Sequence, residues 1–301
     1  MPEATPALHE KIQELIATGR PSISFEFFPP KDDAGEAVLW QAIRRLEPLN
    51  PTFVSVTYGA GGSSRDRTTR ITQRIAQDTT LTPMAHLTCV GASRAELRRV
   101  IAEYADAGVR SVLAIRGDPK EGPRAPWTPH PEGLDYAVDL VRLVRELGRF
   151  SIGVAAFPDV HPASPDFEAD ARILAMKAAA GAQFAITQMF FTEDHYFRLV
   201  ERAAAHGSTM PIIPGIMPVT NVKQINRIAE LSGVALPDAV VSRLHAVADD
   251  PAAVRAVGVD IATELSERLL AGGAPGLHFI TMNRSTATLD VFAGLGLTAR
   301  A

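Results

Sequence analysis

Cysteine is almost absent from this chain of 301 residues, since Cys89 is the only one. A single thiol cannot close an internal disulfide, so the sequence is not a disulfide-stapled secreted scaffold. No apolar run approaches the ~20 residues that a membrane-spanning helix requires. The first residues also lack the basic start and apolar core of a secretory signal. We therefore expect a cytoplasmic protein with no membrane partner.

Clustered positive charge is missing as well. The chain holds 30 Lys and Arg against 34 Asp and Glu, a formal net charge of -4, and no block of basic residues stands alone. Because nucleic acids and anionic membrane surfaces are bound by basic patches, neither is an expected partner. With 22 glycines, 22 prolines and 46% hydrophobic residues, the composition excludes collagen-like, low-complexity and long disordered chains.

What the sequence does contain is a series of short apolar runs, each ending at a turn signal or a polar cluster. Several are continuous in Val, Ile, Phe and Ala, which is typical of strands covered on both faces in a parallel sheet. Polar members such as Ser24, Glu26, Ser55 and Thr57 are expected to point into a common interior. The predicted strands cover residues 23–28, 53–58, 84–90, 111–115, 151–157, 184–191, 212–217 and 277–282.

Segments with helical periodicity separate these runs. Ser93, with Glu96 three residues later, predicts a helix N-terminus, and Gly181 predicts a helix C-terminus. Residues 1–20 are expected to form an N-terminal helix or extension. The other predicted helices cover residues 34–46, 92–107, 136–147, 169–180, 219–231, 238–247 and 251–270, so several precede the last strand.

Eight strands that alternate with helices predict one domain over residues 1–301, a (βα)8 TIM barrel with extra helices before strand eight. The alternative is an open doubly wound sheet, which would carry a Gly-x-Gly-x-x-Gly turn after its first strand. The nearest match, residues 58–64, follows the second strand and has Ser64 where the third glycine belongs. The barrel is therefore the favoured fold.

Glu26 is the most distinctive residue at the predicted strand ends, where barrel enzymes carry their active sites. It stands between Phe25 and Phe27 in an apolar strand, where desolvation should raise its carboxyl pKa. A raised pKa would keep the proton on Glu26 near neutral pH, as a general acid requires. The structural alternative is a buried glutamate paired with an arginine.

The other polar residues at strand ends are less specific. The Arg-Gly-Asp segment 116–118 offers donors and an acceptor side by side, although a turn with a local ion pair would look the same. Gln188 suits the amide edge of a heterocycle, or a backbone partner. His86 and His161 lack metal-ligand spacing, so no metal site is expected. No lysine lies in a predicted strand to serve as a Schiff-base nucleophile.

Several segments resemble the signatures of the methylenetetrahydrofolate reductase family. They are residues 24–31 (Ser-Phe-Glu-Phe-Phe-Pro-Pro-Lys), 53–60, 86–89, 115–118, 185–188, 214–218, 278–279 and 283–284, and they follow the family's order. The resemblance covers about residues 20–298. It implies a barrel that carries FAD across its strand ends, with NADH or NADPH as co-substrate. The implied reaction passes a hydride through the flavin to methylenetetrahydrofolate and yields 5-methyltetrahydrofolate.

The resemblance also implies roles for individual residues. Glu26 would be the general acid that protonates the folate, and Asp118 would lie beside the flavin and the pterin. Substrate-binding residues would be Gln188 at the pterin or nicotinamide, Phe190, and Arg284 at the folate tail. The cofactor-binding residues would be Thr57, His86, Arg116, Gly117, Asp118, Ala137, Phe157, His161, Asp170 and Lys177, with Arg116 and Lys177 as phosphate partners.

The sequence departs from the family pattern at two positions. Phe157 replaces a tyrosine found in many relatives, which removes a flavin hydrogen bond, and Val222 replaces a phenylalanine that stacks on bound substrate in some bacterial relatives. Two alternatives therefore stay open. One is direct hydride transfer from NADH to the same folate without flavin, and the other is a non-catalytic barrel that binds folate or flavin.

Three further expectations follow from the resemblance. The proline-rich segment 119–131 resembles an active-site loop without an assigned role. Family analogy predicts a homo-oligomer. Because the sequence ends soon after the last predicted strand, we expect no regulatory domain of the eukaryotic kind and no control by S-adenosylmethionine.

Overall fold

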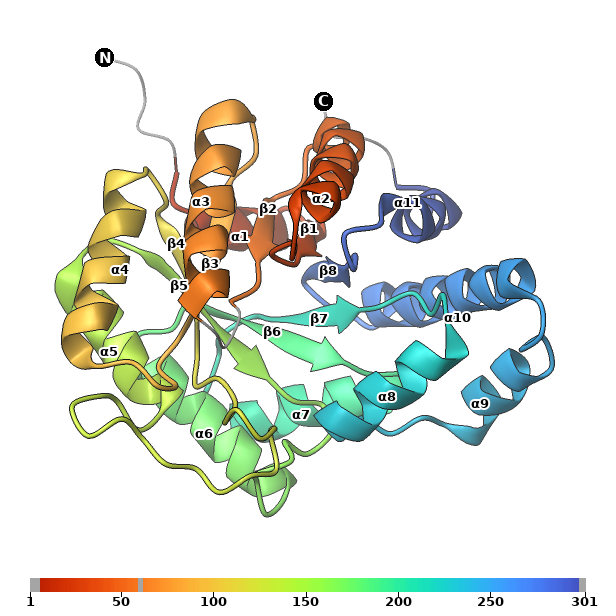
Figure 1. The fold of residues 1–301 in the computed structure, drawn as a ribbon. Coiled ribbons are helices and arrows are strands. Elements are labelled where there is room, and N and C mark those ends of the chain that lie inside the picture. Colours follow the sequence, from red (N-terminus) through yellow and green to blue (C-terminus); the bar gives the residue numbers. More distant parts are fainter. Residues whose placement is uncertain (1–5, 59–61, 298–301) are drawn as a thin grey trace.

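Eight parallel strands close into a barrel in the order β1-β2-β3-β4-β5-β6-β7-β8, which confirms the predicted TIM-barrel fold (Figure 1). The computed structural model describes residues 6–58 and 62–297, apart from the side chains of 62–66. The glycine-rich segment 58–64 therefore lies partly outside the described residues. The strands are β1 (Ser22–Phe27), β2 (Phe53–Val56), β3 (Pro83–Thr88), β4 (Ser111–Ile115), β5 (Ser151–Ala156), β6 (Phe184–Met189), β7 (Ile212–Ile216) and β8 (Gly276–Ile280).

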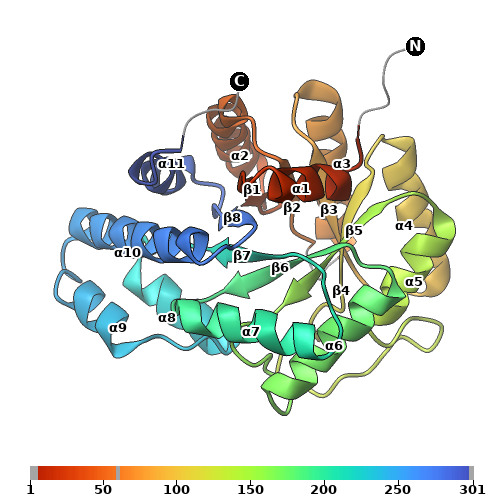
Figure 2. The same ribbon diagram turned by 180° about the vertical axis from the view of Figure 1, so that it is seen from behind.

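Helices surround the strands as an outer layer (Figures 1 and 2). Those in the first half of the chain are α1 (Leu8–Ala17), α2 (Asp33–Leu46), the short 3-10 helix η1 (Glu47–Leu49), α3 (Gly62–Asp78), α4 (Arg94–Asp106) and α5 (Ala137–Leu147). Those in the second half are α6 (Phe167–Ala180), α7 (Glu193–Ala205), α8 (Val222–Ser232), α9 (Asp238–His245), α10 (Pro251–Ala271) and α11 (Ser285–Gly294). Because α8, α9 and α10 all lie between β7 and β8, the extra helices before the last strand are confirmed.

The predicted helix ends are also confirmed. The Ser93 hydroxyl accepts a hydrogen bond from the backbone N–H of Glu96 at 3.2 Å, and the Glu96 carboxylate accepts one from the Ser93 N–H at 2.8 Å. This reciprocal pair starts α4. Gly181 follows α6 with φ of 114°, a left-handed conformation that glycine adopts without strain.

Sequence periodicity did not reveal α3, α7 and α11, and α3 shows why. Its buried face combines Ile71 and Ile75 with two threonines, Thr68 and Thr72, all fully buried. The Thr72 hydroxyl donates to the Thr68 carbonyl at 2.7 Å, which satisfies a polar group inside the helix packing. A helix whose buried face is half threonine carries too few apolar residues for periodicity to detect.

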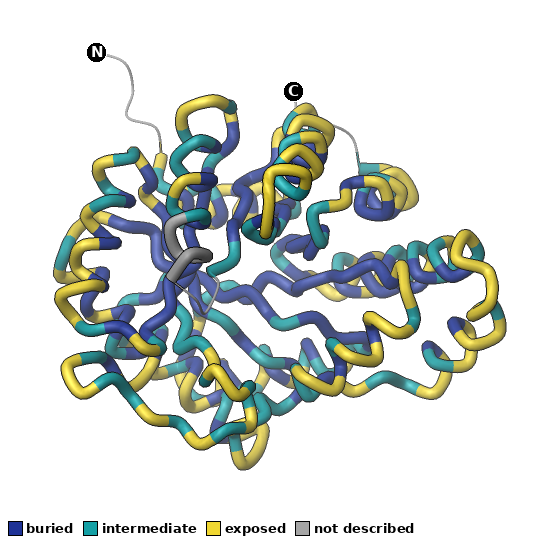
Figure 3. Tube along the Cα trace, viewed as in Figure 1, coloured by how far each residue is buried: buried dark blue, intermediate teal, exposed yellow. Residues whose placement is uncertain are grey.

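The barrel interior is apolar at the end where the strands begin. A buried cluster there joins Leu8 and Ile12 of α1 to strand residues Phe53, Met84, Leu113, Phe184, Ile186 and Ile213. Figure 2 shows α1 lying across the barrel beside β1, and Figure 3 shows the strands as the most buried part of the chain. Since this end is closed by packed side chains, polar chemistry is left to the C-terminal ends of the strands.

The register across β1 brings polar side chains together inside the barrel. Ser24 pairs with Phe53 of β2 on one side and with His278 of β8 on the other. Two residues further along β1, Glu26 pairs with Ser55. Because strand side chains alternate between faces, Ser24 and Glu26 share the inner face, as the sequence predicted.

None of the described helices combines the length and apolar character that a bilayer crossing requires. The outer surface does carry large apolar side chains, among them Ile173 and Met176 of α6, which are 42% and 54% exposed. The homo-oligomer stays a prediction.

Candidate active site

Glu26 is enclosed near the C-terminal end of β1, with its side chain 13% exposed. Its Oε2 atom lies 3.4 Å from Nε2 of His278, with hydrogen-bond geometry. The Nε2 atom of His86 lies 3.4 Å from the same oxygen, without hydrogen-bond alignment. The predicted alternative partner, an arginine, is not what faces this carboxylate. Two imidazoles surround it instead.

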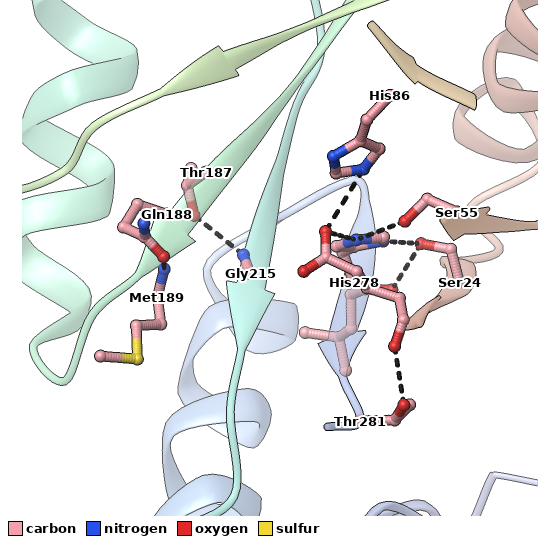
Figure 4. Close-up of polar contacts among 11 residues, drawn as sticks. Ser24, Ser55, His86, Thr187, Gln188, Met189, Gly215, His278 and Thr281 are labelled. Carbon is pink, nitrogen blue, oxygen red and sulfur yellow. Dashed lines mark hydrogen bonds and ion pairs between the residues drawn. The ribbon is translucent and has the colours of Figure 1, made fainter. Parts of the chain in front are cut away.

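His278 is held by contacts on both sides of its ring (Figure 4). Its Nδ1 atom lies 2.7 Å from the Ser24 hydroxyl, and its Nε2 atom lies 3.5 Å from the Ser55 hydroxyl. The ring stacks on Phe53 with centroids 5.6 Å apart. Because a hydroxyl can donate or accept, Ser24 can satisfy Nδ1 in either neutral tautomer. His278 can therefore present to Glu26 either an N–H or a lone pair.

The predicted rise in the Glu26 pKa is wrong. Burial raises the pKa of this carboxyl. The hydrogen bond from His278 and the nearby His86 and His278 imidazoles have the opposite effect, and they outweigh burial, so the pKa lies below its ordinary value. Burial also lowers the pKa of His86 to about 4, so that imidazole is neutral at pH 7. The His278 hydrogen bond is thus the principal contact that favours the carboxylate near neutrality.

The turn after β4 contains both features that the sequence left as alternatives. It has a local ion pair, and it also presents donors and an acceptor to a ligand. The Arg116 Nε donates to the Gly117 carbonyl at 3.2 Å, and Nη2 lies 3.8 Å from the Asp118 carboxylate. The guanidinium packs over the Trp127 ring at 4.7 Å. The Asp118 side chain is 54% exposed, and partial burial raises its pKa against the opposing effect of Arg116. Asp118 can therefore meet a ligand.

Gly117 is required by the turn itself. Its φ is 80°, and a Cβ atom there would lie 2.5 Å from Cγ1 of Val90 and 2.9 Å from Cβ of Thr88. Any side chain would therefore be strained and would collide with the end of β3. The glycine lets the chain leave β4 in the direction that exposes Asp118.

Four of the predicted cofactor residues gather beside the ends of β4 and β5. The Lys177 ammonium donates to the Ala155 carbonyl at 2.8 Å, and the His161 backbone N–H donates to the Asp170 carboxylate at 2.8 Å. Burial lowers the pKa of Lys177 to about 8. Burial, with the charges of Arg116 and Lys177, lowers the pKa of His161 to about 4. Two cations, a neutral imidazole and a carboxylate therefore share one region. The cations suit the pyrophosphate of a dinucleotide, and the carboxylate can accept from its hydroxyls.

The remaining predicted cofactor residues lie at the same end of the barrel. The backbone N–H of Thr57, just after β2, donates to the Phe27 carbonyl at 2.9 Å. Ala137 begins α5 and is buried. The Phe157 ring meets the His161 ring edge-on with centroids 4.6 Å apart. Phe157 thus contributes a ring contact where a tyrosine would also contribute a hydroxyl.

Gln188 lies on a bulge in β6. Ile186 pairs with Ile213 and Met189 with Gly215, so β6 has one residue more than β7 between the two pairs. The Thr187 hydroxyl accepts from the Gly215 N–H at 2.8 Å and replaces the missing strand contact (Figure 4). A Cβ on Gly215 would lie 2.3 Å from the Thr187 carbonyl. Sequence reasoning assigned no role to Thr187 or Gly215, although a glycine inside a strand is a signal for a bulge.

The two other predicted substrate residues differ in their surroundings. Phe190 is 2% exposed, and its ring stacks on Tyr196 of α7 with centroids 5.9 Å apart. It belongs to the core between barrel and helices, so we leave it out of the site. Arg284 is exposed and directly precedes α11, at the same end of the barrel as Glu26.

Comparisons with known proteins agree with one another. The family model for methylenetetrahydrofolate reductase matches residues 11–296. The 5,10-methylenetetrahydrofolate reductase of Pectobacterium carotovorum subsp. carotovorum is 40% identical over 292 residues, covering 97% of this chain and 95% of that protein. The protein of the same name from Escherichia coli (strain K12) is 39% identical over 291 residues, with the same coverage.

Among solved structures, a protein from Clostridium thermocellum that is described as binding two copies of 5-methyl-5,6,7,8-tetrahydrofolic acid aligns with a TM-score of 0.62. The alignment covers 96% of this chain and 98% of that one, at 15% sequence identity. At such low identity the likeness shows a shared fold alone.

Proposed function

Because this chain belongs to the methylenetetrahydrofolate reductase family, we propose that it reduces 5,10-methylenetetrahydrofolate to 5-methyltetrahydrofolate with NADH or NADPH and a bound FAD. The observation that carries this proposal is the buried Glu26 beside His278, within a chain that matches the family over residues 11–296. A protein that only binds folate has no use for a carboxyl enclosed with two imidazoles.

Glu26 is the proposed general acid. Its proton goes to a ring nitrogen of the folate, so that the five-membered ring opens to an iminium that can accept hydride. The pKa of Glu26 is held below its ordinary value, so the free enzyme favours the carboxylate near neutral pH. The acid must therefore take up a proton from solvent before it acts, and the carboxylate left after the transfer again accepts the hydrogen bond from His278 at 3.4 Å.

The proposed substrate contacts come from three strand ends. Asp118 offers a carboxylate acceptor to the amino and ring N–H groups of the pterin, and Gln188 offers both a donor and an acceptor. Arg284 offers a planar cation to the carboxylates of the folate tail. The side chain of Asp118 is more than half exposed, Arg284 is exposed, and Gln188 is partly buried. All three side chains can therefore meet a ligand at the open end of the barrel.

The proposed FAD residues have the charge that this cofactor needs. Arg116 and Lys177 would face the pyrophosphate, and Asp170 would accept from a ribityl or ribose hydroxyl. When bound, FAD would supply a carrier that takes hydride from the nicotinamide and gives it to the folate. The residues of the chain bind and orient the reactants and control the proton at Glu26.

Direct hydride transfer from NADH to the folate is the second candidate. Two observations favour it. Phe157 has no hydroxyl to offer a flavin, and its ring packs against His161. Lys177 is only 7% exposed, and its ammonium already donates to the Ala155 carbonyl, which leaves it less free to meet a flavin phosphate. The same nicotinamide and folate would then meet in one ternary complex.

An absorption spectrum of the purified protein under anaerobic conditions tests these readings. A flavin band that bleaches with NADH and returns with methylenetetrahydrofolate would support the proposal. An unpigmented protein that consumes NADH only when the folate is present would replace it by direct transfer. Tight folate binding without NADH consumption under either condition would show that the protein only binds folate, and it would overturn both reductase proposals.

A further inference from the structure

The Asn283 side chain bonds both backbone groups of Phe28. Its Oδ1 accepts from the Phe28 N–H at 2.8 Å, and its Nδ2 donates to the Phe28 carbonyl at 2.8 Å. Asn283 lies three residues after β8, and Phe28 lies one residue after β1. The carboxamide therefore pairs with Phe28 much as a neighbouring strand would, beyond the point where the β1 and β8 backbones stop pairing.

Thr281 ties the same two segments together at Glu26. Its hydroxyl donates to the Glu26 carbonyl at 2.7 Å, and its backbone N–H donates to the same oxygen at 3.2 Å (Figure 4). The Asn283 N–H donates to the Thr281 hydroxyl at 3.2 Å, and the Arg284 N–H donates to the Thr281 carbonyl at 2.9 Å. One hydrogen-bonded unit thus joins Glu26 at one end to Arg284 at the other.

The backbone of this unit is in an unfavourable conformation. Met282 and Asn283 have φ of 51° and 58°, both left-handed. Asparagine tolerates that region, whereas a methionine there is strained. Such strain persists only where surrounding contacts hold it, and it is concentrated at functional sites. The contacts that hold it here are the paired bonds of Asn283 to Phe28, and the result is a tight reversal that delivers Arg284 to the start of α11.

We propose that Asn283 is a positioning residue that fixes the general acid and the substrate-tail cation relative to each other. The inference rests on the proposed function, in which Glu26 gives a proton to the folate and Arg284 binds the folate tail. Both residues must meet one rigid substrate, and a misplacement of about 1 Å in such an arrangement can cost roughly a hundredfold in rate. Asn283 touches neither reacting group and acts through the backbone of Phe28 and the hydroxyl of Thr281.

Three variants separate the side-chain bonds from the backbone conformation. Asn283→Gly keeps the left-handed conformation and removes both bonds to Phe28. Asn283→Asp keeps the acceptor, loses the donor, and sets a carboxylate against the Phe28 carbonyl. Asn50→Gly makes the same change at another left-handed asparagine (φ of 47°), which is exposed and lies where β2 begins, at the other end of the barrel, so it is the matched control.

We expect Asn283→Gly to lower kcat for folate reduction at least tenfold and to raise the KM for the folate. The oxidation of NADH by an artificial electron acceptor, which needs no general acid, should stay within twofold of wild type. The pH midpoint of folate reduction should also move, because the Glu26 carboxyl shifts relative to His278. Asn50→Gly should match wild type in all three measurements. If Asn283 only stabilised the fold, its loss would not slow folate reduction while leaving NADH oxidation unchanged.

Wild-type kcat, KM and pH midpoint in Asn283→Gly would overturn the inference. If thermal unfolding shows that this variant does not fold, Asn283→Asp carries the same test, with the same losses expected and wild-type values overturning it. If the wild-type protein does not reduce the folate, the proposed function fails. The inference is then judged by the Kd for 5-methyltetrahydrofolate, which Asn283→Gly should raise and Asn50→Gly should not.

Discussion

Glu26 and His278 approach to 3.4 Å between Oε2 and Nε2, although they are 252 positions apart in the chain. They meet because β1 and β8 are neighbours in the closed barrel. The contact decides the electrostatics of the site, since it lowers a carboxyl pKa that burial alone would raise.

Replacing Glu26 by glutamine keeps the shape of the side chain and removes its proton. We expect Glu26→Gln to slow folate reduction by roughly 10²- to 10⁴-fold, the usual contribution of a general acid. Oxidation of NADH by an artificial acceptor should be nearly unchanged. Glu230→Gln, at an exposed residue paired with Arg227, is the matched control and should leave both rates alone. Equal survival of both half-reactions in Glu26→Gln would show that another group is the acid.

His278→Asn should shift the pH dependence of folate reduction. The hydrogen bond from His278 lowers the Glu26 pKa, so its loss should raise that pKa. Because a general acid acts in its protonated form, the fall in rate with rising pH should move to higher pH. The measurement is the pH profile of folate reduction in single turnovers. An unchanged midpoint in His278→Asn, or an equal shift in the surface variant His206→Asn, would contradict this account.

Lys177 should impose a pH dependence on stability. Its pKa is about 8 in the folded protein and 10.5 in the unfolded chain, so between these values the unfolded chain binds more protons. The free energy of unfolding should therefore gain a rising contribution from pH 8 to 10.5. Chemical denaturation across that range should show the rise in wild type, and Lys177→Met should lack it.

The same variant tests the cofactor contact. Loss of a charged hydrogen bond to phosphate weakens binding by roughly tenfold to a hundredfold, so Lys177→Met should raise the Kd for FAD by that factor. Lys223→Met, on the exposed face of α8, is the control for removing a charge. Equal FAD affinity in wild type and Lys177→Met would remove Lys177 from the proposed cofactor site.

Thr187 should affect Gln188 through the bulge in β6. Thr187→Val leaves the buried Gly215 N–H without its acceptor, which costs about 1–3 kcal/mol of stability. The bulge should then relax, and the KM for the folate should rise more than kcat falls. Thr187→Ser keeps the hydroxyl and should restore most of both quantities. If valine and serine behave alike, the hydroxyl does not hold the bulge.

Trp127 should report on cofactor binding. The chain has two tryptophans, so Trp40→Phe leaves Trp127 as the single indole. Trp127 lies against Arg116, at 4.7 Å, in the proposed cofactor region, and a flavin absorbs light that tryptophan emits. Addition of FAD to flavin-free Trp40→Phe protein should quench the emission with the saturation curve of binding. Quenching that does not saturate would contradict the proposed location.

The fold was largely predictable, because alternation of strands and helices is a local property of the sequence. Continuous apolar runs revealed the strands, and capping residues such as Ser93 and Gly181 revealed helix ends. The electrostatics of the site were not predictable in the same way. Whether burial or hydrogen bonding controls the Glu26 pKa depends on His278, and only the closure of the barrel decides that these residues meet. Likewise Phe190 follows a strand that ends at the site, yet its ring turns into the core against Tyr196.

The pairing of β1 with β8 has a consequence for the synthesis of the chain. Long-range strand pairing forms slowly, because the loop-closure entropy must be overcome before the contacts form. Ser24 and Glu26 emerge from the ribosome early, whereas His278 and Asn283 come nearly last. Glu26 and His278 cannot form their contact until the eighth strand docks beside the first. The proposed activity thus requires completed folding, and a chain truncated before residue 276 should not reduce the folate.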